Sequence, residues 1–206
     1  SKEAMAVTPL LILLYDRIFL APTLHEAFRK RWGLYAALAL TWGILVPMVL
    51  TAGLSRSERT ADPVTIWEYA RTQFGVVVHY LRLSVWPDAL CLDYQWPVAQ
   101  SAGDIVPPAA LLGVVLLAVL WALWRRPKWG FLGASFFLAL APSSSVIPIP
   151  DLAFEHRMYL PLAPLVVAAV LGVYMAGRKL IGSRPSLRPA ARLSSVCLIA
   201  GIAGVL

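Results

Sequence analysis

Apolar residues in this chain come in long blocks that are separated by shorter polar stretches. Each block is roughly 16–23 residues long, which suits an α-helix that crosses the ~30 Å hydrocarbon core of a membrane. The pattern therefore predicts an all-α, polytopic transmembrane helical bundle of about six spans. The predicted spans cover residues 4–20, 33–54, 109–124, 130–148, 161–177 and 192–206.

The stretch 64–86 lies between the second and third blocks and has a different pattern. Small or polar residues recur there at spacings of 3, 4, 4 and 3, at Glu68, Arg71, Gly75, His79 and Arg82. This spacing places them on one stripe of a helix. Within the loop 55–108 we therefore predict an outer helix that lies in the membrane interface or re-enters the bilayer. Its stripe faces either water, as in a surface helix, or a lipid headgroup or cavity.

Lysine and arginine are segregated from the acidic residues. Residues 29–31, 125–128 and 178–192 hold 11 of the 18 basic residues, whereas residues 55–108 and 149–160 hold 8 of the 11 acidic residues. Because cytoplasmic loops are enriched in Lys and Arg, the first set is predicted to be cytoplasmic and the second set to lie outside. The net charge of +7 then follows from loop topology. It does not indicate a nucleic-acid partner.

The overall composition agrees with a membrane protein. The chain is 59% hydrophobic and 14% charged, whereas about 25% of the residues in a soluble domain are charged. Its two cysteines, Cys91 and Cys197, form neither a metal-binding pattern nor a disulfide framework. Because the chain starts at Ser1 and ends inside an apolar run, we expect it to be an internal segment of a longer protein.

Charged groups gather between two apolar blocks, where Asp151, Glu155, His156 and Arg157 fall within seven positions. Charge at the edge of a membrane is costly and usually functional. Glu and His transfer protons, and the guanidinium of Arg matches the oxygens of a phosphate. We therefore predict Glu155, His156 and Arg157 as catalytic residues that act on a phosphate with an apolar tail. Alternatively, Glu155 and Arg157 only pair with each other or with a neighbour at the interface.

Three stretches resemble a known family. "SKE" at 1–3, "YLRLSVWPDALCLDYQWP" at 80–97 and "PSSSVIPIPDLAFEHRMYLP" at 142–161 are similar to bacterial relatives of the transmembrane and tetratricopeptide-repeat O-mannosyltransferases. Those proteins look like members of the GT-C class, the polytopic glycosyltransferases with polyprenyl-phosphate sugar donors. The motifs occur in the family's order and span most of the chain. The resemblance implies that this chain is a fragment of a GT-C-like membrane domain over residues 1–206.

The resemblance also implies an activity. A sugar, mannose or another hexose, would pass with inversion from a polyprenyl-phosphate donor to a Ser/Thr hydroxyl on exported proteins. The catalytic base would be an aspartate in a loop upstream of Ser1. We expect Arg157, with His156 and Lys2, to face the lipid phosphate, and Glu155 to orient them or to hold a divalent cation if one is used. The predicted substrate-binding residues are Lys2, Glu3, Arg82, Asp93 and Tyr159.

The implied location is the bacterial inner membrane, with the active face in the periplasm. Three other functions stay open: a lipid-linked glycan ligase or polymerase, a transporter of such lipids, and a non-catalytic membrane anchor for a repeat domain. The enzyme interpretation predicts that Arg157→Gln lowers turnover strongly while expression stays intact.

Overall fold

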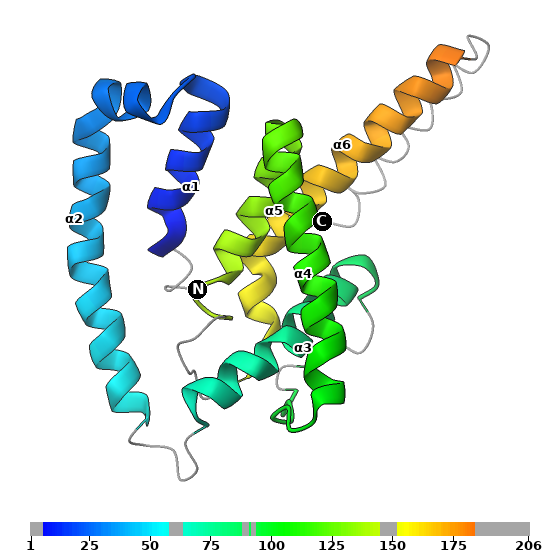
Figure 1. Cartoon of the computed structure of the whole chain (residues 1–206). Coiled ribbons are helices and arrows are strands. Elements are labelled where there is room, and N and C mark those ends of the chain that lie inside the picture. The colour runs from blue at the N-terminus through cyan, green and yellow to red at the C-terminus, as the bar shows by residue number, and fades with distance from the viewer. Residues whose placement is uncertain (1–5, 58–63, 88–90, 92–93, 145–151, 184–206) are drawn as a thin grey trace. The chain divides into compact units, whose positions relative to one another are not determined.

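The chain folds into helices in a computed structural model, which describes residues 6–57, 64–87, 91, 94–144 and 152–183 (Figure 1). This part of the chain contains no strand, so the all-α prediction is confirmed. The helices are α1 (Thr8–Tyr15), η2 (Asp16–Leu20), α2 (Leu24–Ser57), α3 (Ile66–Val85), α4 (Ala102–Arg125), α5 (Pro127–Leu140), η3 (Glu155–Met158) and α6 (Tyr159–Ser183).

The chain divides into two compact units, residues 1–165 and 166–206. All contacts described below belong to the first unit. The described part of the second unit is the C-terminal portion of α6, along which most side chains are exposed. The prediction of one partial transferase domain over 1–206 stays a prediction.

Two helical segments are long and apolar enough to cross a membrane among the residues that the structure describes. They are Ala102–Arg125, which is α4, and Glu155–Lys179, which is η3 with most of α6. At 1.5 Å per residue, the 24 residues of α4 extend for about 36 Å. Most side chains of α4 are exposed, and Leu112 is the one residue of this helix that is buried. These segments contain the predicted spans 109–124 and 161–177.

Two of the predicted spans form helices that are too short for this role. The segment 130–148 was expected to cross the membrane, but α5 has only 14 residues and ends at Leu140, which gives a length of about 21 Å. Pro142 follows two residues after the end of α5. Proline lacks the N–H that a continuing helix needs, so the helix stops before it. The segment 4–20 forms an α-helix of 8 residues and a π-helix of 5 residues.

The described residues therefore contain two candidate spans, and the prediction of six is not supported. The predicted span 33–54 lies inside α2, a helix of 34 residues, part of whose side chains fall outside the description. The predicted span 192–206 lies outside the described residues altogether.

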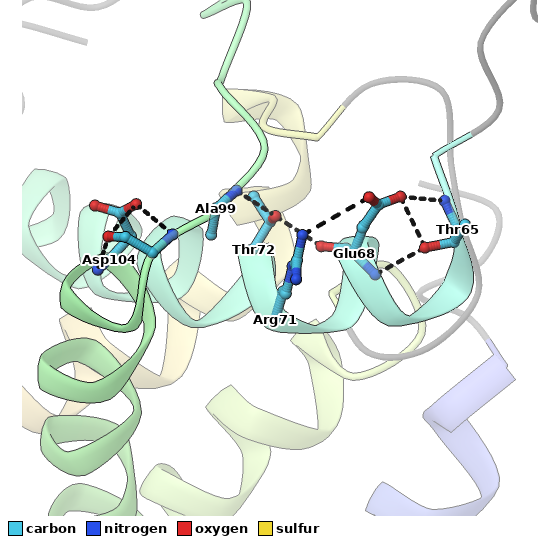
Figure 2. A network of polar contacts seen from close by, with 7 residues as sticks. Thr65, Glu68, Arg71, Thr72, Ala99 and Asp104 are labelled. Atoms are coloured by element: carbon cyan, nitrogen blue, oxygen red, sulfur yellow. Dashed lines mark hydrogen bonds and ion pairs between the residues drawn. The ribbon is translucent and has the colours of Figure 1, made fainter.

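Helix α3 confirms the helix predicted over 64–86, and Figure 2 shows how it begins. The Thr65 hydroxyl accepts a hydrogen bond from the backbone N–H of Glu68, and the Glu68 carboxylate accepts one from the backbone N–H of Thr65. This reciprocal pair satisfies two N–H groups that would otherwise have no partner. Glu68 and Arg71 of the predicted polar stripe also form an ion pair at 3.7 Å.

The face of α3 that packs inward is a different one from the predicted stripe. It consists of six buried residues at helical spacing, Tyr69, Thr72, Gln73, Val76, Val77 and Tyr80. Val76, Val77 and Tyr80 share a buried cluster with Leu112 of α4, Phe136 and Leu140 of α5, Ala153 before η3 and Met158 in η3. The sequence pattern therefore found the helix but not its buried face.

The segment that leads into α4 runs along α3 (Figure 2). The backbone N–H of Ala99 donates to the Thr72 hydroxyl at 3.0 Å, and that hydroxyl donates to the carbonyl of Glu68. Helix α4 then begins with a second reciprocal cap between Ser101 and Asp104. The loop 94–100 is thereby placed next to the segment that contains η3.

Candidate functional site

The candidate site is built where residues 152–158 lie against α3. The Tyr80 hydroxyl accepts a hydrogen bond from the backbone N–H of Phe154 at 2.7 Å and donates to the carbonyl of the same residue at 2.9 Å. The Gln73 side chain donates to the carbonyl of Leu152 at 3.2 Å. Irregular backbone next to apolar helices needs such partners. These bonds hold the "EHR" motif in a fixed place.

Arg157 points into the protein, and its exposed fraction is only 9%. Its Nη1 donates to the Tyr69 hydroxyl at 3.3 Å, to the carbonyl of Ser143 at 3.2 Å and to the carbonyl of Leu152 at 3.3 Å. Tyr69 itself donates to the same Ser143 carbonyl at 2.6 Å. The guanidinium therefore joins α3, the end of α5 and the segment before η3. These contacts are those of a positioning residue.

Glu155 connects two motifs that are far apart in the sequence. Its Oε1 accepts a hydrogen bond from the Tyr94 hydroxyl at 2.6 Å and another from the backbone N–H of Cys91 at 2.7 Å. Tyr94 belongs to the stretch "DYQWP", 61 positions before Glu155. The carboxylate is held by two donors, and a charged acceptor makes each of these bonds stronger than a neutral one.

Tyr94 is fixed from its other side by aromatic contacts. The ring of His79 on α3 lies 5.0 Å from the ring of Tyr94 and 5.0 Å from that of Trp96. Gln95 between them has a φ of 41°, which is uncommon for a residue other than glycine. Backbone strain of this kind is found where surrounding contacts enforce it, here by packing both flanking rings against α3.

Burial raises the pKa of Tyr94 to about 12, and its hydrogen bond to the Glu155 carboxylate adds to the increase. An ordinary tyrosine ionises near pH 10. The folded protein thus holds this proton more tightly than the unfolded chain does. The resulting contribution to stability is complete below about pH 10 and is lost as the pH rises towards about 12.

The ionisation of Tyr94 gives a direct test of this contact. The phenolate absorbance of Tyr94 is the difference between the wild type and Tyr94→Phe. We expect it to appear with a midpoint near pH 12. In Glu155→Gln the midpoint should move part of the way back towards 10, because burial is the larger cause. A midpoint near 10 in the wild type would show that the Tyr94–Glu155 bond is absent.

The other predicted site residues are not drawn together. His156 is exposed and its ring lies 5.0 Å from that of Phe154. Arg82 is exposed in the last turn of α3, and Tyr159 is 88% exposed at the start of α6. Glu155, His156 and Arg157 share one turn of η3, yet one faces Tyr94, one faces outward and one is buried. Lys2, Glu3 and Asp93 lie outside the described residues.

Several residues that build the site were missed by the sequence analysis. Tyr69, Gln73 and Tyr80 recur at spacings of 4 and 7, the spacing of one helical face. Together with the buried valines between them, this pattern was the available signal. The predicted stripe was instead defined by the charged residues Glu68, Arg71 and Arg82, which lie on a neighbouring face of the helix.

A second buried polar group ties α1 and α2 together away from this site. Asp16 is 2% exposed, and its two carboxylate oxygens accept hydrogen bonds from Arg31 and Tyr35, each at 2.8 Å. With every oxygen engaged inside the protein, Asp16 acts as a structural link between the helices. In the described parts of the chain, no group of three or more His, Cys, Asp or Glu side chains is arranged to hold a metal ion.

Comparisons with protein-family models, with curated proteins and with solved structures gave no significant match to this chain.

Proposed function

We propose that this chain is part of a membrane glycosyltransferase that passes a hexose from a polyprenyl-phosphate donor to Ser/Thr hydroxyls of exported proteins. The observation that carries the proposal is the bond between Tyr94 and Glu155. It joins the "DYQWP" and "EHRM" stretches, the two motifs on which the resemblance to the O-mannosyltransferases mainly depends. Motifs that meet in space despite their distance in sequence suit a shared site better than two unrelated loops.

The position of this contact suits a donor with an apolar tail. Residues 94–100 lead directly into α4, and η3 leads directly into α6. The site thus lies at the beginning of both helices that are long enough to cross a membrane. A polyprenyl chain would lie along such helices while its phosphate stays at their polar end. On the sidedness predicted from the loop charges, this end faces the periplasm.

In the proposed reaction, the acceptor hydroxyl oxygen attacks the anomeric carbon of the sugar and gives its proton to the upstream aspartate. The bond from that carbon to the phosphate oxygen breaks, and polyprenyl phosphate leaves with the electron pair. Negative charge grows on the phosphate, so a nearby cation stabilises the transition state most. His156 and Arg82 are the exposed candidates for this role, and Arg157 positions the segment that carries His156.

The same proposal includes a GT-C arrangement of the spans and an interfacial position for α3. In the GT-C arrangement, α4 and α6 would be joined by further spans of a longer protein, and α2 supplies one if its apolar part crosses the membrane. Helix α3 would lie in the interface beside the site. The proposed location is the bacterial inner membrane.

Mass spectrometry of exported proteins tests the proposed function. Wild-type cells should carry hexose on Ser/Thr residues, and deletion of the parent gene should remove it. Glu155→Gln in the full-length protein should lower this hexose about tenfold or more. Glu155 loses its charge in this variant while Tyr94 keeps a possible acceptor.

Glu26→Gln is the matched control, because it makes the same chemical change in an ion pair with Lys30 on the surface of α2. It should leave the hexose unchanged, and both variants should be found in the membrane at wild-type amounts. Hexose that persists after deletion of the gene would exclude protein O-glycosylation. A lipid-linked glycan ligase or a lipid transporter would then be the function to test.

A further inference from the structure

Helix α3 carries an apolar face that the described part of the chain leaves uncovered. Trp67 is 77% exposed and Val85 is 83% exposed, and Phe74 between them is exposed as well. Residues 67 and 85 are 18 positions apart, which is five turns of an α-helix, so they project in the same direction. Val78 and Leu81 lie on the same side but are half-buried and pack against the core cluster, so they are not part of the uncovered surface. We call Trp67, Phe74 and Val85 the outer face of α3.

The depth of α3 along α4 indicates what covers this face. Helix α3 contacts α4 and runs across its N-terminal half (Figure 1). The buried residues of α3 share their cluster with Leu112, which is the fourth residue of the apolar run 109–124. Leu112 is therefore only about 4.5 Å inside the start of that run. If α4 crosses the membrane, α3 lies where hydrocarbon meets the headgroups.

Side chains at the borders of the outer face suit this depth. Trp67 is in the first turn of α3 and the exposed Trp86 follows its last residue, and tryptophan is enriched at the membrane–water boundary. Arg71 and Arg82 lie on one flank of the face. Arginine at such positions keeps its apolar stem against hydrocarbon and its charge among phosphates.

We infer that the outer face of α3 is a lipid-binding surface that inserts into the boundary between acyl chains and headgroups. Its occupant is the phospholipid of the same membrane that α4 crosses, so the inference rests on the membrane crossing in the proposed function. The surface would hold Glu155 and Tyr94 at the level of the donor's phosphate, because Tyr94 packs on His79 of α3 and Glu155 follows Phe154, which is bonded to Tyr80 of α3. The sequence analysis had considered only the polar stripe of this helix as a surface for a lipid headgroup, with water or a cavity as alternatives.

Fluorescence quenching by brominated lipids tests this surface directly. The full chain would be reconstituted in phosphatidylcholine vesicles whose acyl chains carry bromine either near the glycerol or near the chain end. The Trp67 signal is the difference between wild type and Trp67→Phe. We expect this signal to be lost with bromine near the glycerol and to be retained much better with bromine near the chain end.

Two matched variants make each outcome decisive. Trp96→Phe isolates a half-buried tryptophan that packs on His79, and its signal should resist both lipids. Trp121→Phe isolates an exposed tryptophan on α4, which should be quenched if α4 crosses the membrane. A quenched Trp121 with an unquenched Trp67 would overturn the inference and show that protein covers the outer face of α3. Two unquenched residues would overturn the membrane crossing of α4 together with the inference.

Discussion

Replacing Arg157 by Gln is expected to destabilise the fold by about 3 kcal/mol. The guanidinium is buried and donates to the carbonyls of Ser143 and Leu152 and to the hydroxyl of Tyr69. Glutamine is shorter and cannot reach all three acceptors, so buried carbonyl groups lose a charged donor. Chemical unfolding of the protein in detergent, followed by circular dichroism, would measure the loss.

Arg82→Gln is the matched control, because Arg82 is an exposed arginine on α3. It should change the stability by less than about 0.5 kcal/mol. Tyr69→Phe should show an intermediate loss, since it removes one partner of Arg157 and keeps the cation. This expectation revises the one drawn from the sequence, in which turnover falls and the amount of protein stays the same. A stable Arg157→Gln variant without turnover would favour direct contact of Arg157 with the phosphate.

Replacing Gly130 by Ala is expected to destabilise the α4–α5 hairpin by about 3 kcal/mol or more. A Cβ at Gly130 would overlap the backbone of Leu123 and Ala122 on α4. Backbone atoms in a helix cannot move aside, so α5 would have to shift as a whole. Because Phe136 and Leu140 of α5 belong to the cluster that supports α3, the shift would reach the candidate site. Thermal unfolding in detergent would measure the change.

Two other glycines separate this clash from the general effect of adding a methyl group. Gly133→Ala would meet the Cγ2 of Val119 at 2.5 Å, which is a side-chain atom and not backbone, so its effect should be smaller, although valine has little rotamer freedom in a helix. Gly113→Ala on α4 meets nothing within 4 Å and should be neutral or stabilising by up to about 1 kcal/mol, the helix preference for alanine. Equal effects at all three positions would show that the close contact of α4 with α5 is absent.

Local patterns in the sequence were enough to predict part of this arrangement. The apolar runs of α4 and α6 are long enough to cross a membrane, and this length can be counted along the chain. The run that became α5 was equally apolar, but Pro142 limits its helix to 14 residues. Hydropathy averages over a window and does not register where one residue ends the backbone hydrogen bonding.

The candidate site was only partly predictable. Glu155, His156 and Arg157 were recognised because charge between two apolar runs is unusual. Arg157 and His156 were expected to face one phosphate and Glu155 to orient them, and these roles stay predictions. In η3 their side chains point to different partners, and which one is buried depends on Tyr69 and Ser143, residues distant in the sequence.

The sequence by itself determined the helical class, the two helices long enough for a membrane and the helix over 66–85, because each depends on composition and spacing within one segment. Only the tertiary structure decided that α3 packs through Tyr69, Gln73 and Tyr80, and that Tyr94 meets Glu155. Both outcomes depend on contacts between residues more than 60 positions apart. The physical reason is that burial and hydrogen bonding depend on which surfaces pack together in the fold. A helix with several faces of mixed polarity does not specify which of its faces will be buried.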